Sequence, residues 1–99
     1  MGSGIKTFHG SFFGTTGVAV DVTKVGFRPV AVKLINVTSG DEMEWFEGMA
    51  DGSGFKRVAA GAGALAATNA ITPLANGFRL GTDGDMNATG ELVRFECFE

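Results

Sequence analysis

Glycine is the sequence feature that most constrains how this chain folds. It accounts for 16 of the 99 residues, more than twice its ordinary share of about 7%. An interior glycine lowers helix stability by about 1 kcal/mol relative to alanine. Valine, threonine and phenylalanine, with nine residues each, fit the pleated surface of a half-buried strand. The bias therefore predicts short strands joined by glycine turns.

Alternation of apolar and polar residues locates these strands along the chain. Residues 5–13 and 18–22 flank a Gly-Thr-Thr-Gly turn and predict a hairpin. Further strands are predicted over residues 30–37, 42–45, 55–58, 78–80 and 92–99, while the alanines of residues 64–70 suit two helical turns. The expected fold class is all-β: a small β-sandwich (jelly-roll-like) or a barrel of about seven or eight short antiparallel strands.

Length and charge limit the remaining possibilities. Residues 5–99 are expected to form one domain, and residues 1–4 are interpreted as a flexible N-terminus or a tag remnant. A net charge of −3 argues against nucleic acid as a partner, because phosphates require a basic face. The chain contains neither a membrane-length apolar run nor a signal-peptide pattern.

The residues that could carry catalysis are few. The single histidine, His9, and the single cysteine, Cys97, lie at opposite ends of the chain. Cys97 alternates in phase with Val93 and Phe95, which indicates a buried structural thiol. Residues 61–66 imitate a dinucleotide-binding glycine fingerprint but lack the βαβ context that this fingerprint needs. The sequence therefore predicts neither an enzyme nor a bound cofactor.

Two acidic clusters are candidate sites. Asp83, Asp85 and Asn87 have the spacing of the first ligands in a calcium loop, but the required glycine and glutamate are missing downstream. A solvated turn is the preferred interpretation, so no metal is predicted. The four carboxylates of residues 41–47 could hydrolyse glycosides only beside a substrate cleft, which so small a domain is not expected to hold.

The same acidic segment contains two aromatic residues. Trp45 is out of phase with the glutamates and is expected in the core, whereas Phe46 follows the acidic face. Glu44 and Phe46 are therefore candidates for a surface that contacts a ligand.

Two uncharged stretches, residues 9–20 and 58–78, predict an interface. Interfaces are depleted of charge at their centres, and small side chains permit close approach of another backbone. A flexible surface loop is the competing interpretation. The candidate interface residues are Phe12, Phe13, Ala60, Ala64, Leu65, Ala66 and Ile71. Self-association, with three copies expected, would bury these residues.

Four segments resemble small virion proteins of tailed bacteriophages. They are Gly-Phe-Arg-Pro at 26–29, Val-Lys-Leu-Ile-Asn at 32–36, Trp-Phe-Glu-Gly-Met-Ala-Asp-Gly at 45–52 and Asn-Gly-Phe-Arg-Leu-Gly-Thr-Asp at 76–83. The last segment, followed by Met86, Asn87 and Gly90, is also similar to a segment of phage tail-fibre β-domains. The resemblance implies a β-sandwich that assembles in copies on a virus particle, and it supplies no catalytic residues.

Two functions follow from this resemblance. The first is a capsid decoration (cement) protein, assembled in the host cytoplasm, that bridges capsomers as a homotrimer bound to the major capsid protein. The alternative is a tail-fibre or tail-tip module that recognises a host glycan or protein receptor.

Overall fold

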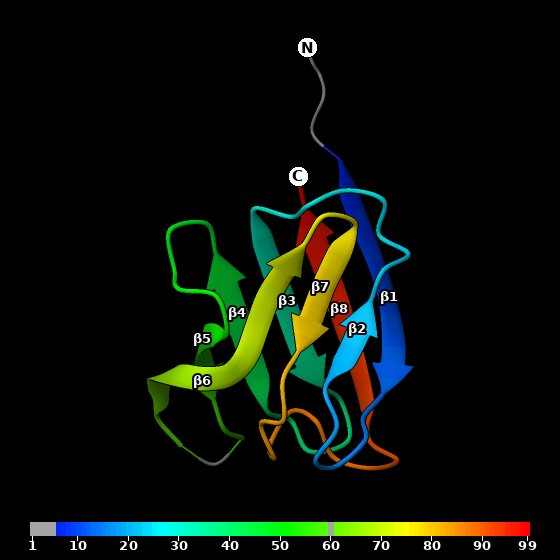
Figure 1. The fold of residues 1–99 in the computed structure, drawn as a ribbon. Coiled ribbons are helices and arrows are strands. Elements are labelled where there is room, and N and C mark those ends of the chain that lie inside the picture. Colours follow the sequence, from blue (N-terminus) through cyan, green and yellow to red (C-terminus); the bar gives the residue numbers. More distant parts are fainter. Residues whose placement is uncertain (1–5, 60) are drawn as a thin grey trace.

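The computed structural model describes residues 6–59 and 61–99, which form one antiparallel β-sheet (Figure 1). The prediction for residues 1–4 lies outside the described residues. The strands are β1 (Thr7–Phe13), β2 (Val20–Val22), β3 (Ala31–Asn36), β4 (Glu42–Phe46), β5 (Ser53–Arg57), β6 (Gly63–Leu74), β7 (Gly77–Leu80) and β8 (Leu92–Phe98). Their order in the sheet is β1-β8-β3-β4-β5-β6-β7-β2. The all-β class with eight short antiparallel strands is confirmed.

The centre of the sheet follows the alternation that the sequence predicts. In β3, Val32 and Leu34 are buried while Lys33 and Ile35 are exposed, and β8 alternates in the same way. Successive side chains of a strand point to opposite faces, so one face of the sheet is packed and the other is solvated. These two faces are called the inner and the outer face below.

The predicted hairpin of residues 5–22 is wrong. β1 pairs along its whole length with β8, from Thr7 opposite Phe98 to Phe13 opposite Leu92, and β2 pairs instead with β7. Contacts distant in sequence account for the difference. The rings of Phe8 and Phe95 stack on the inner face at 6.0 Å between centroids, and burial of large aromatic side chains outweighs a local turn signal.

The sheet curls on itself (Figure 1), and the buried side chains of its strands form the core on the inner face. Its largest fully buried side chains are those of Trp45, Phe78, Met43, Ile71 and Leu80, which are at most 1% exposed. Trp45 also donates its indole N–H to the Ala50 carbonyl oxygen at 3.1 Å. The predicted core position of Trp45 is confirmed.

The curl brings the two ends of the sheet toward each other without joining them. Phe12 of β1 and Phe78 of β7 lie 6.3 Å apart between ring centroids. Side chains of β1, of β2 and of the two residues after β2 line a groove of about 260 Å³ between these edge strands. The edges of β1 and β2 therefore face each other across a seam.

The predicted helical turns over residues 64–70 are wrong, because they form part of the longest strand, β6. Its first residues pair with β5 from Gly63 opposite Arg57 to Ala66 opposite Gly54, and its last residues pair with β7. The ring of Phe55 lies over Gly63 and would have to move aside for a side chain at this position. Asn69, with φ of 61°, bends the strand between its two halves.

Candidate functional site

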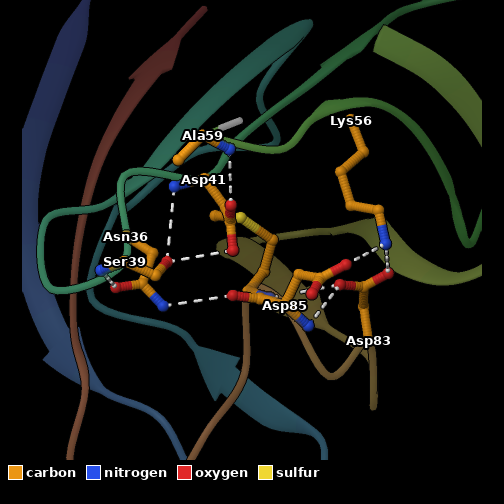
Figure 2. Close-up of polar contacts among 8 residues, drawn as sticks. Asn36, Ser39, Asp41, Lys56, Ala59, Asp83 and Asp85 are labelled. Atoms are coloured by element: carbon orange, nitrogen blue, oxygen red, sulfur yellow. Dashed lines mark hydrogen bonds and ion pairs between the residues drawn. The ribbon is translucent and has the colours of Figure 1, made fainter. Parts of the chain in front are cut away.

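The two carboxylates expected in a turn bind a lysine (Figure 2). The ammonium of Lys56, on β5, lies 2.8 Å from Asp83 Oδ2 and 2.8 Å from Asp85 Oδ2. The hydrogen bond to Asp83 raises the pKa of Lys56 most, and the hydrogen bond to Asp85 raises it further. Asp83 Oδ1 also accepts the backbone N–H groups of Asp85 and Met86, which closes the turn. The lysine ammonium thus supplies the positive charge that a bound cation would bring.

The three residues with the spacing of calcium ligands do not converge. The buried Asn87 amide points elsewhere, donating to the carbonyl oxygens of Val18 and Gly81, both at 2.8 Å. Its oxygen accepts the backbone N–H of Thr15. Over residues 6–59 and 61–99, no group of three or more acidic, histidine or cysteine side chains is placed to hold a metal ion.

A second polar cluster joins the loop after β3 to the rest of the sheet (Figure 2). Asp41, 8% exposed, accepts hydrogen bonds from Ser39 Oγ at 3.0 Å and from the Ala59 N–H at 2.9 Å. Asn36 is fully buried and donates to the Asp85 carbonyl oxygen and to Glu91 Oε1. In the described chain, no buried side-chain nitrogen or oxygen is left without a partner. These polar residues therefore hold loops in place.

His9 and Cys97 come from neighbouring strands but point to opposite faces. Cys97 lies opposite Phe8 and is fully buried, whereas His9 lies opposite Glu96 and is exposed. Burial raises the pKa of the Cys97 thiol to about 12. A thiol in this environment is inert, as expected of a structural cysteine.

The acidic residues 41–47 are also dispersed. Asp41 belongs to the internal cluster, Glu42 and Glu44 point to the outer face, and Glu47 pairs with Arg28 at 3.0 Å on the surface. No two of them share an enclosed cleft in the part of the chain that the structure describes. The glycine fingerprint of residues 61–66 leads into the strand β6, where a dinucleotide site would need a helix.

A shallow groove of about 480 Å³ runs over the outer face across β1, β8, β3 and β4. Charges of both signs line it, since Lys33 lies between Glu96 and Glu44 in one row across the strands. The predicted contact residue Glu44 is in this groove, and Phe46, 44% exposed, follows on the same strand. The exposure predicted for Phe46 is confirmed.

The predicted interface residues fall into two groups. Leu65 and Phe13 are each 65% exposed, and Ala64 is exposed beside Leu65. Ile71 is fully buried, and Phe12 and Ala66 pack against the core from partly buried positions. Ile71 therefore belongs to the core, where a partner chain cannot reach it. Ala60 lies outside the described residues.

One further apolar side chain joins Leu65. Phe55 of β5 is 39% exposed and lies directly opposite Leu65 in the ladder between β5 and β6. We call residues 55–57 of β5 and residues 63–68 of β6 the arm. The interface prediction did not include Phe55, because this residue lies outside the uncharged stretch. The sequence does predict a strand at Phe55, Lys56 and Arg57.

No known protein family, curated protein or solved structure matches the chain. Within the described ranges, no helix is long and apolar enough to span a membrane.

Proposed function

We propose that this protein is a non-enzymatic structural protein that works by burying its arm against another protein chain. The observation that carries the proposal is the exposed pair of Leu65 and Phe55 on cross-strand positions, with small residues on either side of Leu65 in β6. Removal of apolar surface from water provides about 25 cal/mol per Å². An exposed apolar pair beside a strand segment without charged side chains is a surface suited to contact with another protein chain.

The specific role that we propose is that of a capsid decoration protein of a tailed bacteriophage. The supports are the resemblance of residues 26–29, 32–36, 45–52 and 76–83 to small virion proteins and the small all-β domain. In this role the arm contacts further copies of the chain, three being expected, and the major capsid protein. The protein then resides on the virion after assembly in the host cytoplasm.

One observation favours the alternative role of a tail-fibre or tail-tip recognition module. The outer-face groove combines charges of both signs with the exposed ring of Phe46 nearby. Polar groups of this kind orient a glycan or a peptide while an aromatic ring stacks on it.

Light scattering on the purified protein tests the association. Leu65→Glu places a charge on a side chain that is already 65% exposed, so folding is retained while burial of an unpaired charge costs several kcal/mol. Val37→Glu is the matched control, because Val37 is 46% exposed and lies outside both uncharged stretches. We expect Leu65→Glu alone to dissociate the assembly.

Particle binding tests the virion role separately. Wild-type protein is expected to co-sediment with phage particles and to be located on their shell by electron microscopy, whereas Leu65→Glu stays unbound. Label on the tail tip would support recognition in place of decoration. Normal particle binding by Leu65→Glu would contradict the use of the arm in either role.

A further inference from the structure

The first half of β6 has a backbone edge that no other described strand covers. Gly63–Ala66 pair with β5 on one side, and β7 pairs only with residues 71–74 on the other. Between these segments, the carbonyl oxygens of Asn69 and Ala70 accept the N–H groups of Asp83 and Gly81. Residues 63–68 therefore present alternate N–H and C=O groups sideways, as an edge strand does.

The devices that usually protect such an edge are missing from this segment. Proteins place lysine, other charges or proline on free strand edges, but Gly63–Thr68 contains none of these and is exposed except at the half-buried Ala66. The edges of β1 and β2 differ, because they face each other across the seam and β2 carries the ion pair of Asp21 with Arg79. Unprotected edge backbone is thus concentrated on the arm.

We propose that Gly63–Thr68 pairs antiparallel with the same segment of a second copy of this chain, about a two-fold axis, so that two sheets join into one. This inference rests on the self-association proposed above and assigns two copies to this contact in place of three. A two-fold contact is isologous and closes on two copies, whereas a trimer needs two different surfaces. The inference therefore specifies a dimer at this contact.

A second copy fits this edge in charge and in size. The segment brings no charge into the contact, so no unpaired charge is buried when two identical edges meet. Four of its six residues are alanine or glycine, and the other two are Leu65 and Thr68. The space between the paired strands therefore holds few bulky side chains.

The two-fold axis also covers the exposed apolar pair. An axis perpendicular to the sheet keeps corresponding residues of both copies on the same face. Leu65 and Phe55 lie opposite each other on adjacent strands. The register that places Leu65 on the axis extends their row across the junction into the same two residues of the second copy. One contact therefore satisfies both the edge hydrogen bonds and the apolar surface.

Single-cysteine variants test the symmetry. In an antiparallel two-fold pair, one residue lies opposite its own copy with its Cβ about 4.5–5.5 Å away. We expect one of Ala64→Cys, Leu65→Cys, Ala66→Cys and Ala67→Cys to give covalent dimers under mild oxidation. Ala75→Cys, exposed in the turn at the other end of β6, is the control that stays monomeric. The native Cys97 is fully buried and does not compete.

Amide hydrogen exchange tests the strand pairing itself. Outward N–H groups of residues 63–68 are expected to exchange at least about tenfold more slowly at concentrations where copies associate than in dilute monomer. If the arm is buried in the assembly without strand pairing, Leu65→Glu still abolishes association. The amide exchange of residues 63–68 is then unchanged on association, and no variant cross-links more than Ala75→Cys does. That result overturns this inference and leaves the proposed function standing.

Two other outcomes would overturn the inference. Protected edge amides without any self-cross-link would show that β6 pairs with a different edge, as in a ring of three copies. A wild type that stays monomeric at every concentration would exclude the second copy as the occupant, and particle binding would then decide the proposed function independently.

Discussion

At the scale of single residues, close approaches of backbone explain where glycine is indispensable. Gly77 begins β7 opposite Leu74, and a Cβ built on it would collide with the backbone carbonyl of Val22 in β2. The strand β2 therefore lies so close to Gly77 that no methyl group fits between them. Gly84, by contrast, has nothing within 4 Å of the position where its Cβ would lie.

Gly77→Ala is therefore expected to destabilise the protein by about 2 kcal/mol or more, since overpacking forces backbone shifts. The free energy of unfolding from urea denaturation measures the effect. Gly84→Ala is the control and should change stability by less than about 0.5 kcal/mol. Equal effects for the two variants would mean that β2 can move away from β7 without loss.

The lysine between two carboxylates gives a second prediction at this scale. The Lys56 and Asp83 side chains are 23% and 9% exposed, so Lys56→Met leaves a largely buried carboxylate with only its backbone hydrogen bonds. We expect a loss of about 1–3 kcal/mol in the free energy of unfolding.

The matched control is the pair of Arg28 and Glu47, whose side chains are 48% and 58% exposed. Arg28→Met should cost less than about 1 kcal/mol, as exposed ion pairs contribute little. Adding a divalent chelator to the wild type should not reproduce the effect of Lys56→Met, because the charge in this cluster comes from the chain itself. A large fall in melting temperature with chelator would revive the calcium interpretation.

At the scale of elements, the sequence predicted strands well where one face is buried and poorly where the partner is distant. The alternation over β3, β4 and β8 identified these strands to within one or two residues, because the packed inner face requires it. β1 and β2 were found as strands but paired wrongly, since a turn signal carries no information about β8 and β7. The alanines of β6 favour a helix locally, and pairing with β5 and β7 overrides this preference.

The arm shows the same limit for the candidate site. The absence of charge over residues 58–78 pointed to the arm but could not separate the exposed Leu65 from the fully buried Ile71 of the same stretch. The bend at Asn69 between them produces the difference. A positive φ at an asparagine is a local property that alternation patterns do not reveal.

Asn69 supplies the prediction for this element. Its φ of 61° lies in the left-handed region, which asparagine and glycine tolerate and β-branched residues do not. Asn69→Gly is expected to change the free energy of unfolding by less than about 1 kcal/mol, whereas Asn69→Val should lower it by about 1–2 kcal/mol. Thermal unfolding of both variants checks the difference. If Asn69→Val is as stable as the wild type, β6 does not need the left-handed conformation at residue 69 to pair with both β5 and β7.

At the scale of the whole molecule, one curled sheet holds the core between strands that are far apart in sequence. β8 lies between β1 and β3, so the two ends of the chain take part in the same layer as its middle. Cys97, near the C-terminus, is fully buried between Phe8 on β1 and Val32 on β3. We therefore expect that exposure of this thiol requires unfolding of the whole sheet, so that its ionisation reports on global stability.

Alkaline pH is accordingly expected to destabilise the fold through Cys97. Burial raises the thiol pKa from 9.0 to about 12, so between these values the unfolded chain has lost a proton that the folded chain keeps. The unfolded state binds fewer protons, and the free energy of unfolding falls by up to about 1.4 kcal/mol for each pH unit above 9. Lys56, whose pKa is also raised, adds to the fall only above its usual value of 10.5.

Urea denaturation of the wild type and of Cys97→Ala at pH 8 and pH 10 separates the contribution of Cys97 from that of Lys56. The wild type should lose stability over this interval and Cys97→Ala should lose less, while a thiol reagent should leave the folded wild type unmodified at both pH values. Equal losses in the two proteins, or rapid modification of the folded wild type, would show that β8 opens locally and that the sheet does not unfold as one unit.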